Sequence, residues 1–183
     1  MNAFQKFIGH INTINKHRFL VRKLCFKCGL YWQGLIHDLS KYSPVEFWNG
    51  VKFYTGIKSP HYGERDAYGY SKAWLHHKGH NKHHAEYWQD IDGGITKPIS
   101  IPTQYLFEMI CDRIAASMVY LKDKHTDDAA LNYYLSHKYE NDFNDGTRNR
   151  LEYWLQRVSK AGAEKTLQEM KQQLKDEKRK RKL

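Results

Sequence analysis

The stretch PTQYLFEMICDRIAASMVYL, residues 102–121, decides the fold that we expect for this chain. Its apolar side chains recur at the spacing of one face of a helix. These apolar positions are Leu106, Ile110, Ile114 and Met118. Pro102 suits the first turn of a helix. The stretch therefore predicts a long helix with one face in the core, and Asp112 falls in the middle of it.

Helical spacing continues on the N-terminal side, where sustained strand-like alternation is absent. A first helix is predicted over residues 3–28, with His17 inside it. A short helix over Tyr31–Asp38 should follow, then a turn at Leu39–Ser43, and Pro44 should open another helix. The fold class that we expect is therefore all-α.

Two segments between these helices are predicted to be loops. Residues Thr55–Tyr70 contain glycines, a proline and several charges, which favour irregular structure and a functional lid or binding loop. Residues Asp92–Ser100 are predicted to form the second loop. The histidine-dense residues 71–91 lie between the two, and we expect two short helical pieces there, broken near Gly79 and Asn81.

The C-terminal part is also predicted to be helical. We expect a helix over Ala129–His137, a polar turn at Asn141–Gly146, a helix that contains Trp154, and a last helix after Gly162. The sequence has no internal repeat, no glycine-rich phosphate loop and no βαβ alternation. Its pattern therefore argues against P-loop and Rossmann nucleotide sites.

Length and composition favour a single domain with a real core. The chain has 183 residues, 40% of them hydrophobic. We expect a helical domain over residues 1–160 and a basic helix or tail over residues 161–183. No stretch approaches the roughly twenty apolar residues of a membrane span, and residues 1–20 are too polar for a signal peptide. These features predict a cytoplasmic protein that does not enter a membrane.

The net charge of +10 favours polyanionic partners. Part of this charge lies in the run KQQLKDEKRKRKL, residues 171–183. Nucleic acid is one partner that such a run can bind, although a basic run is more often a solvated helix end.

The three cysteines are predicted to be buried, unpaired thiols. Cys25 and Cys28 form a C-x-x-C pair, but Cys111 leaves an odd number and no second pair is present. A redox motif and a zinc knuckle are the alternative interpretations of this pair. We favour a third interpretation, in which the thiols are buried and behave as small apolar side chains. Unpaired thiols of this kind suit a reducing compartment.

Histidine and aspartate residues follow one another in an order that indicates a metal site. Imidazole nitrogen and carboxylate oxygen suit divalent ions such as Mn, Zn, Fe, Ni or Co. An adjacent His-Asp pair can serve a site of two ions, because the carboxylate can bridge them. The predicted ligands of one or two such ions are His17, His37, Asp38, His77, His84 and Asp112.

The histidine-dense segment leaves the choice of ligands open. It holds His76, His77, His80, His83 and His84. Neighbours in a helix diverge by about a hundred degrees, so not all five can reach one site. We favour His77 and His84, with His80 as an alternative partner of His84. The other histidines are predicted to lie at the surface, and His61 is also a candidate substrate contact; they are His10, His61, His125 and His137.

The order His, His-Asp, Asp resembles that of the HD superfamily of metal-dependent phosphohydrolases. The resemblance runs from about His17 to Ser117, and its flanks strengthen it. The segment LIHDLSKYSP, residues 35–44, looks like the HD-x-x-K version of the motif, and MICDRIAAS, residues 109–117, is similar to the helix that supplies the last aspartate. The segment HHKGHNKHH is denser in histidine than the minimal motif, and resembles members that hold two or more metals.

This resemblance implies an HD-like helical bundle with a central metal site. It implies hydrolysis of a phosphoester, in particular of a nucleotide or cyclic nucleotide, by a metal-activated water. The residues expected to act in catalysis are Asp38, Lys41 and Arg113, and those expected to bind substrate are Lys41, Arg65 and Tyr70. Four aromatic residues are candidates to stack on a base; they are Tyr62, Tyr68, Tyr70 and Trp74.

Two other functions fit the same sequence. Some relatives of the HD superfamily with additional histidines hold two irons and activate oxygen, as in the myo-inositol oxygenase type. Iron and oxygen dependence would distinguish that activity from hydrolysis. The second alternative is a non-catalytic module that the metal stabilises and whose basic C-terminus binds nucleic acid. Steep salt dependence of binding without turnover would indicate such a module.

Overall fold

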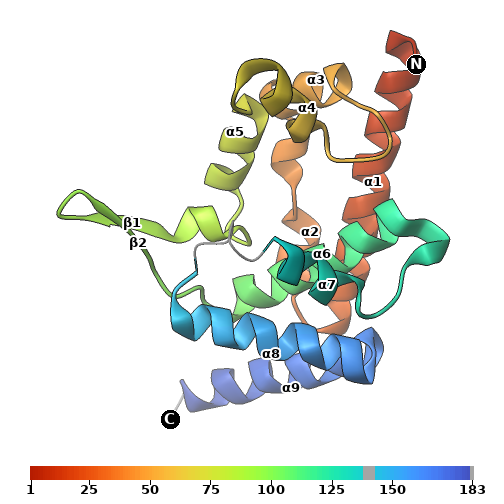
Figure 1. Ribbon diagram of the computed structural model, residues 1–183. Coiled ribbons are helices and arrows are strands. Elements are labelled where there is room, and N and C mark those ends of the chain that lie inside the picture. Colours follow the sequence, from red (N-terminus) through yellow and green to blue (C-terminus); the bar gives the residue numbers. More distant parts are fainter. Residues whose placement is uncertain (138–142, 182–183) are drawn as a thin grey trace.

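The computed structural model describes residues 1–137 and 143–181, and it is predominantly helical (Figure 1). The predicted all-α class is confirmed. Helix α1 spans Ala3–Lys27 and helix α6 spans Thr103–Leu121. These two helices pack against each other, so the long helix expected at residues 102–121 lies at the centre of the fold.

Helix α1 begins with a capping box. The side chain of Asn2 accepts a hydrogen bond from the backbone N–H of Gln5, and the side chain of Gln5 accepts one from the backbone N–H of Asn2. Backbone donors that a helix start leaves without partners are satisfied in this way. The helix ends just before Gly29, which adopts a left-handed conformation at φ 81°, and its bounds agree with the prediction of residues 3–28.

The segment after α1 forms two α-helices and, between them, a short 3-10 helix. Helix α2 spans Tyr31–Ile36, the 3-10 helix η1 spans Leu39–Tyr42, and helix α3 spans Pro44–Lys52. The predicted helix over Tyr31–Asp38 therefore ends earlier, and most of the predicted turn is a 3-10 helix. Pro44 opens α3 as expected.

The predicted loop over Thr55–Tyr70 is wrong for most of its length, because helix α4 spans Pro60–Tyr68. Pro60 fits its first turn, where a missing N–H costs nothing. Gly69 ends the helix at φ 78°, a left-handed conformation that glycine adopts readily. Composition suggested a loop, but the proline and the glycine are helix boundaries.

Residues 71–91 form helix α5 over Lys72–His80 and the 3-10 helix η2 over Ala85–Trp88, as two pieces broken at Asn81. The predicted loop over Asp92–Ser100 is wrong in part. Strand β1 (Gln89–Asp92) pairs antiparallel with strand β2 (Ile95–Pro98). The hairpin projects from the helices (Figure 1), and its turn is the Gly93–Gly94 pair, both at positive φ.

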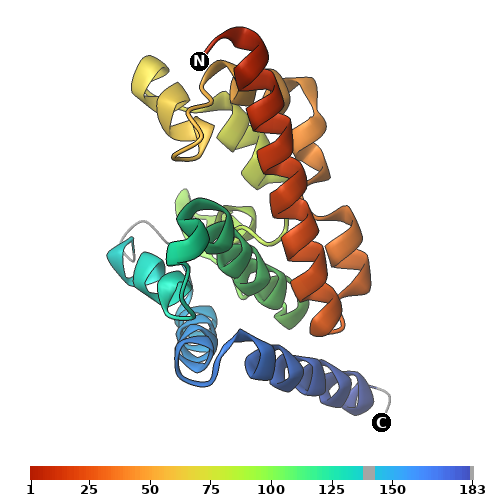
Figure 2. The ribbon, with the colours of Figure 1, turned by 90° about the vertical axis from the view of Figure 1, so that its right-hand side faces the viewer.

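The C-terminal helices cover one end of the α1–α6 pair. They are η3 (Lys122–Lys124), α7 (Ala129–Ser136), α8 (Asp145–Ala161) and α9 (Ala163–Lys180). Of the predicted turn at Asn141–Gly146, residues 141–142 lie outside the described residues, and α8 occupies its end. Figure 2 shows α9 near the end of α1 opposite the N-terminus.

Helix α9 is part of the fold rather than a detached tail. Leu167 and Met170 are fully buried in the same core as Val21, Ile110 and Leu155. The more basic second half of the helix is largely exposed. None of the helices in the described part of the chain is long and apolar enough to cross a membrane.

The prediction that His10 lies at the surface is wrong. Its side chain on α1 is 7% exposed and packs against Gly50 of α3. A Cβ atom at Gly50 would lie 2.1 Å from the Nε2 atom of His10, so the glycine lets the two helices approach. His61, His125 and His137 are partly buried. The close packing of α1 against α3 supports the α3 side of the candidate metal centre.

Candidate metal centre

The predicted ligands come together between α1, the turn after α2, the segment from α5 to η2, and α6. Asp38 lies at that turn, in a left-handed conformation at φ 54° and ψ 26°. Aspartate tolerates this conformation better than most residues do. The turn places the carboxylate inside the protein, where His37 and Asp38 are each 1% exposed.

One group of ligand atoms belongs to His17, His37, Asp38 and Asp112, and all four atoms lie within 4.8 Å of one another. The Nε2 atom of His17 lies 2.9 Å from Oδ1 of Asp112. The Nε2 atom of His37 lies 3.5 Å from the same oxygen and 3.5 Å from Oδ2 of Asp38. Two imidazoles and two carboxylates therefore converge on a common point, as the sequence order predicted.

A second group belongs to Asp38, His77, His83 and His84. The Nε2 atoms of His77 and His83 each lie 3.4 Å from Oδ1 of Asp38. Oδ2 of Asp38 faces the first group, and Oδ1 faces the second. Asp38 thus has the geometry of a carboxylate that could bridge two cations.

Several buried atoms of the centre make no hydrogen bond within the described residues. They are Nε2 of His37, Oδ1 of Asp38, Nε2 of His83 and Nε2 of His84. Burial of a polar atom without a partner is costly, and such atoms are rare in proteins. A divalent cation in each group would give all four atoms a partner, so the residues fit a metal.

Glu108 orients one histidine of each group. Its Oε1 atom lies 2.9 Å from Nδ1 of His37 and 3.3 Å from Nδ1 of His83, and each ring can donate its Nδ1–H to it. This leaves Nε2 of both rings as an acceptor that points toward Asp38. Carboxylates commonly fix the tautomer and direction of metal-bound histidines in this way. Glu108 could also join a metal group with His37 and His83, but the hydrogen bonds favour the orienting role.

Glu46 has the same relation to His77. Its Oε2 atom lies 2.8 Å from Nδ1 of His77, and its Oε1 atom lies 2.7 Å from Nδ1 of His76. His76 is therefore directed toward Glu46 rather than toward Asp38. His80 is exposed and donates to the carbonyl of His76, so neither His76 nor His80 joins a group.

The charges of the centre favour cation binding. Burial opposes ionisation, but His37 and Lys41 hold the pKa of Asp38 well below its usual value. Burial likewise opposes ionisation of Asp112, but the nearby His17 and His37 hold the pKa of Asp112 well below its usual value. Burial and the nearby His83 hold the pKa of His84 well below its usual value. Anionic carboxylates and a neutral imidazole are the forms that bind metals.

The charge of His37 is linked to the carboxylates around it. Burial would lower its pKa, but Asp38, Asp112 and Glu108 together raise that pKa well above the usual value. A proton on this ring supplies positive charge among the carboxylates. A metal ion would therefore compete with this proton.

The side chains predicted to act on the substrate, in catalysis or in binding, are only partly brought together. The Nζ atom of Lys41 lies 3.4 Å from Oδ2 of Asp38 and 3.5 Å from Nε2 of His77. Arg113 lies over the ring of Tyr134, with its guanidinium carbon 5.7 Å from the ring centroid, on the side of α7. Arg65 and Tyr70 are exposed, and Lys41 is the member of the predicted set that reaches the centre.

Sequence reasoning missed His83, Glu46 and Glu108. His83 follows the break at Asn81, where helical angles no longer predict direction. Glu108 had a usable signal, since it precedes Asp112 by one helical turn and therefore shares its face of α6. The signal for Glu46 was weaker: it is an acidic residue in the first turn of α3.

The fold and the site define a helical protein with buried histidine, aspartate and glutamate groups that could hold metal ions. The chain belongs to the family of unknown function DUF5662, whose model matches residues 6–157. This range includes every residue of both groups. Comparison with curated proteins and with solved structures gives no match.

Proposed function

We propose that this protein is a metal-dependent phosphohydrolase that uses two cations bridged by Asp38. The observation that carries the proposal is the division of the Asp38 carboxylate, with Oδ2 beside His17 and His37 and Oδ1 beside His77 and His83. A shared carboxylate is a common way to hold two ions a few ångströms apart, and such pairs suit phosphoryl transfer. The resemblance of the HD-x-x-K segment to HD phosphohydrolases supports the same activity.

The cations would be held in two distinct environments. His17, His37, Asp38 and Asp112 would hold one ion, and Asp38, His77, His83 and His84 the other. When bound, the ions would supply a water of near-neutral pKa and offset the charge of phosphoryl oxygens. This mixture of imidazole and carboxylate suits Mn, Zn, Fe, Ni or Co.

Lys41 would bind the substrate. Its side chain is 29% exposed, and its ammonium lies against Asp38 at the edge of the centre. Burial disfavours its charge, but Asp38 and Glu46 raise its pKa, so it remains a cation. A fixed ammonium beside the ions can donate hydrogen bonds to phosphoryl oxygens and stabilise charge that develops there. The substrate would be a small-molecule phosphoester.

The protein would act in the cytoplasm, because its three cysteines are buried free thiols, which suit a reducing compartment.

A second candidate function is oxygen activation by two irons. The five imidazoles of the two groups favour it, because imidazole binds iron well. Iron dependence, oxygen consumption and visible absorption of the purified protein would identify this activity. Phosphate release that needs a divalent ion but no oxygen would identify hydrolysis.

The test compares the parent with Asp38→Asn. Asparagine keeps the size of aspartate and tolerates a left-handed backbone, whereas alanine would add backbone strain of about 1–2 kcal/mol. Metal content and phosphate release from a panel of esters are measured for both. We expect Asp38→Asn to lose the metals and the activity. The matched control is Asp66→Asn, at an exposed aspartate of α4, which should retain both. Full turnover by Asp38→Asn would refute the proposal.

A further inference from the structure

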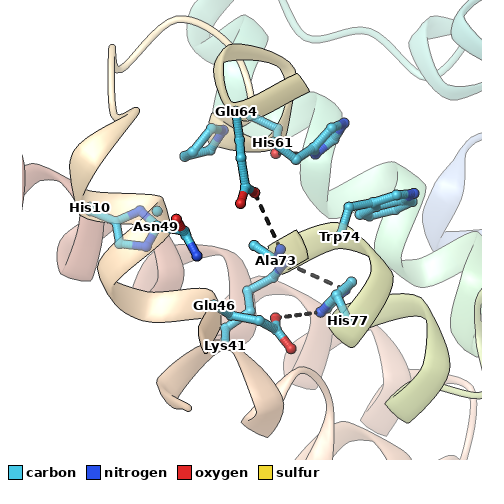
Figure 3. Close-up of a pocket in the computed structure, with 12 residues that line it drawn as sticks. His10, Lys41, Glu46, Asn49, His61, Glu64, Ala73, Trp74 and His77 are labelled. Carbon is cyan, nitrogen blue, oxygen red and sulfur yellow. Dashed lines mark hydrogen bonds and ion pairs between the residues drawn. The ribbon is translucent and has the colours of Figure 1, made fainter. Parts of the chain in front are cut away.

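A cavity adjoins the metal centre between α3, α4 and α5, and several polar side chains line it (Figure 3). Lys41 and His77 line it, and both also contact Asp38. Its opposite wall includes His10, Asn49 and His61. A phosphoester with its phosphorus at the centre would therefore extend the alcohol part into this cavity.

The cavity is small. Its volume is about 50 Å³, and a water-sized group needs about 10–15 Å³ of such space. This space corresponds to a few water-sized groups. The glycerol part of a glycerol phosphate is of this size, whereas a nucleoside is several times larger.

The lining favours uncharged hydroxyl groups. The two carboxylates of the wall already accept hydrogen bonds, Glu46 from His76 and His77, and Glu64 from Ser71 and the backbone of Ala73. Lys41 is the single ammonium or guanidinium group among the described residues that line the cavity. An additional carboxylate or phosphate on the alcohol would thus meet two anions and one cation.

The imidazoles of the wall are uncharged near neutral pH. Burial and the nearby Lys41 lower the pKa of His10 to about 4, and burial together with Lys41 and Arg65 lowers that of His61 to about 3. A neutral imidazole offers one donor and one acceptor. Nδ1 of His61 already contacts Oγ of Ser59 at 2.8 Å, which leaves Nε2 of that ring for a hydroxyl group.

Trp74 has no free face for a nucleobase. Its ring lies between His61 and His77 (Figure 3), with centroid distances of 4.7 Å and 5.6 Å and a stacked arrangement in both cases. It is the one indole or phenyl ring among the described residues that line the cavity. Base stacking, which the sequence suggested for Trp74, is therefore disfavoured here.

We propose that this cavity binds the alcohol part of the substrate, and that the substrate is a phosphate monoester of a small, uncharged, hydroxylated alcohol. The inference rests on the proposed phosphohydrolase function and names the substrate class of the same site. The small volume of the cavity favours small alcohols, and the charge and hydrogen bonding of the wall favour hydroxyl groups.

The first test measures kcat/KM of the full-length, Mn²⁺-loaded protein for three monoesters. Glycerol phosphate has the expected size and charge, phosphoglycerate adds a carboxylate at similar size, and adenosine monophosphate is much larger. We expect glycerol phosphate to exceed each of the others by about tenfold or more. Equal or faster hydrolysis of either competitor, with Mn²⁺ still required, would overturn the substrate class and leave the proposed function standing. Absence of Mn²⁺-dependent hydrolysis of any ester would overturn both.

The second test fills the cavity. Ala73 lines it from α5, and Ala73→Leu would occupy the space of about three of those water-sized groups. The rate ratio of glycerol phosphate to methyl phosphate, which has almost no alcohol part, should fall about tenfold. The matched control is Ala67→Leu, at an exposed alanine of α4, which should keep the parent ratio. An unchanged ratio in a folded Ala73→Leu protein would overturn the subsite, and the first test stands if that variant fails to fold.

Discussion

Oε1 of Glu108 lies 2.9 Å from Nδ1 of His37, and this contact turns the opposite nitrogen of the ring toward Asp38. Both side chains are buried, so water does not replace the hydrogen bond. The same carboxylate oxygen also contacts Nδ1 of His83. One glutamate thus sets the direction of a histidine in each of the two groups.

Glu108→Gln should weaken metal binding by about 10–100-fold, because an amide fixes the two rings less strongly than a carboxylate does. Competition with a chromophoric chelator measures the affinity. Glu164→Gln, at an exposed surface ion pair with Lys27, is the control and should bind as the parent does. Parent-like affinity of Glu108→Gln would contradict the orienting role.

Single ligand substitutions should separate the two groups. His17 belongs to the first group alone and His84 to the second alone, whereas Asp38 belongs to both. We therefore expect His17→Ala and His84→Ala each to lose one of two bound ions, and Asp38→Asn to lose both. Metal content per chain, measured after gel filtration, checks this. Loss of both ions in each variant would indicate a single cooperative site.

Gly50→Ala should destabilise the fold by about 1–3 kcal/mol, because the new methyl group would overlap the buried His10 ring. The same substitution in a His10→Ala background should be neutral, or stabilising by up to about 1 kcal/mol, since alanine is the better helix former. Urea unfolding of the four proteins gives both values. If Gly50→Ala lowers the stability equally in the parent and in the His10→Ala protein, the new methyl group does not overlap the His10 ring.

Protonation of His10 should destabilise the native state in mild acid. Its pKa is about 4 in the folded protein against 6.5 for the free side chain, so the unfolded chain binds the proton first. The stability from the neutral ring is complete above about pH 6.5 and is lost as pH falls toward 4. At about pH 5 the loss should be at most about 2 kcal/mol.

The measurement compares urea unfolding of parent and His10→Gln with chelator present, at about pH 7.5 and about pH 5. The stability advantage of the parent over His10→Gln should shrink by at most about 2 kcal/mol. His80→Gln, at an exposed histidine of α5, is the control. An advantage of His10 that grows in acid would have the wrong sign for a ring that is buried in its neutral form.

Much of the helical fold could be predicted from the sequence, because long amphipathic stretches such as residues 102–121 carry a strong periodic signal. Helix α4 was not predicted, although Pro60 and Gly69 mark its ends, because the glycine and the charges within it are typical of a loop. The β1–β2 hairpin was missed because its exposed strands have no buried face to create alternation. Its Gly93–Gly94 turn was the available signal.

The candidate site was predictable as a set of residue types and only partly as a set of positions. The order of His17, His37, Asp38 and Asp112 in the sequence anticipated the first group, which the structure brings together. His83 was not foreseen, because the chain changes direction at Asn81 and the angle between neighbouring side chains then depends on tertiary packing. His10 was misplaced because the role of Gly50 depends on a contact between helices far apart in sequence.

The wide separation of His17 on α1 from Asp112 on α6 has a consequence for biosynthesis. Neither cluster around Asp38 is complete until long after α1 has left the ribosome, and the first needs α6 as well. Nascent chains would therefore expose scattered histidines without a high-affinity pocket, and selective uptake of an ion would come only after the helices have docked. The metal concentration in the cell would then determine which ion the folded domain binds, and would not affect the early steps of its folding.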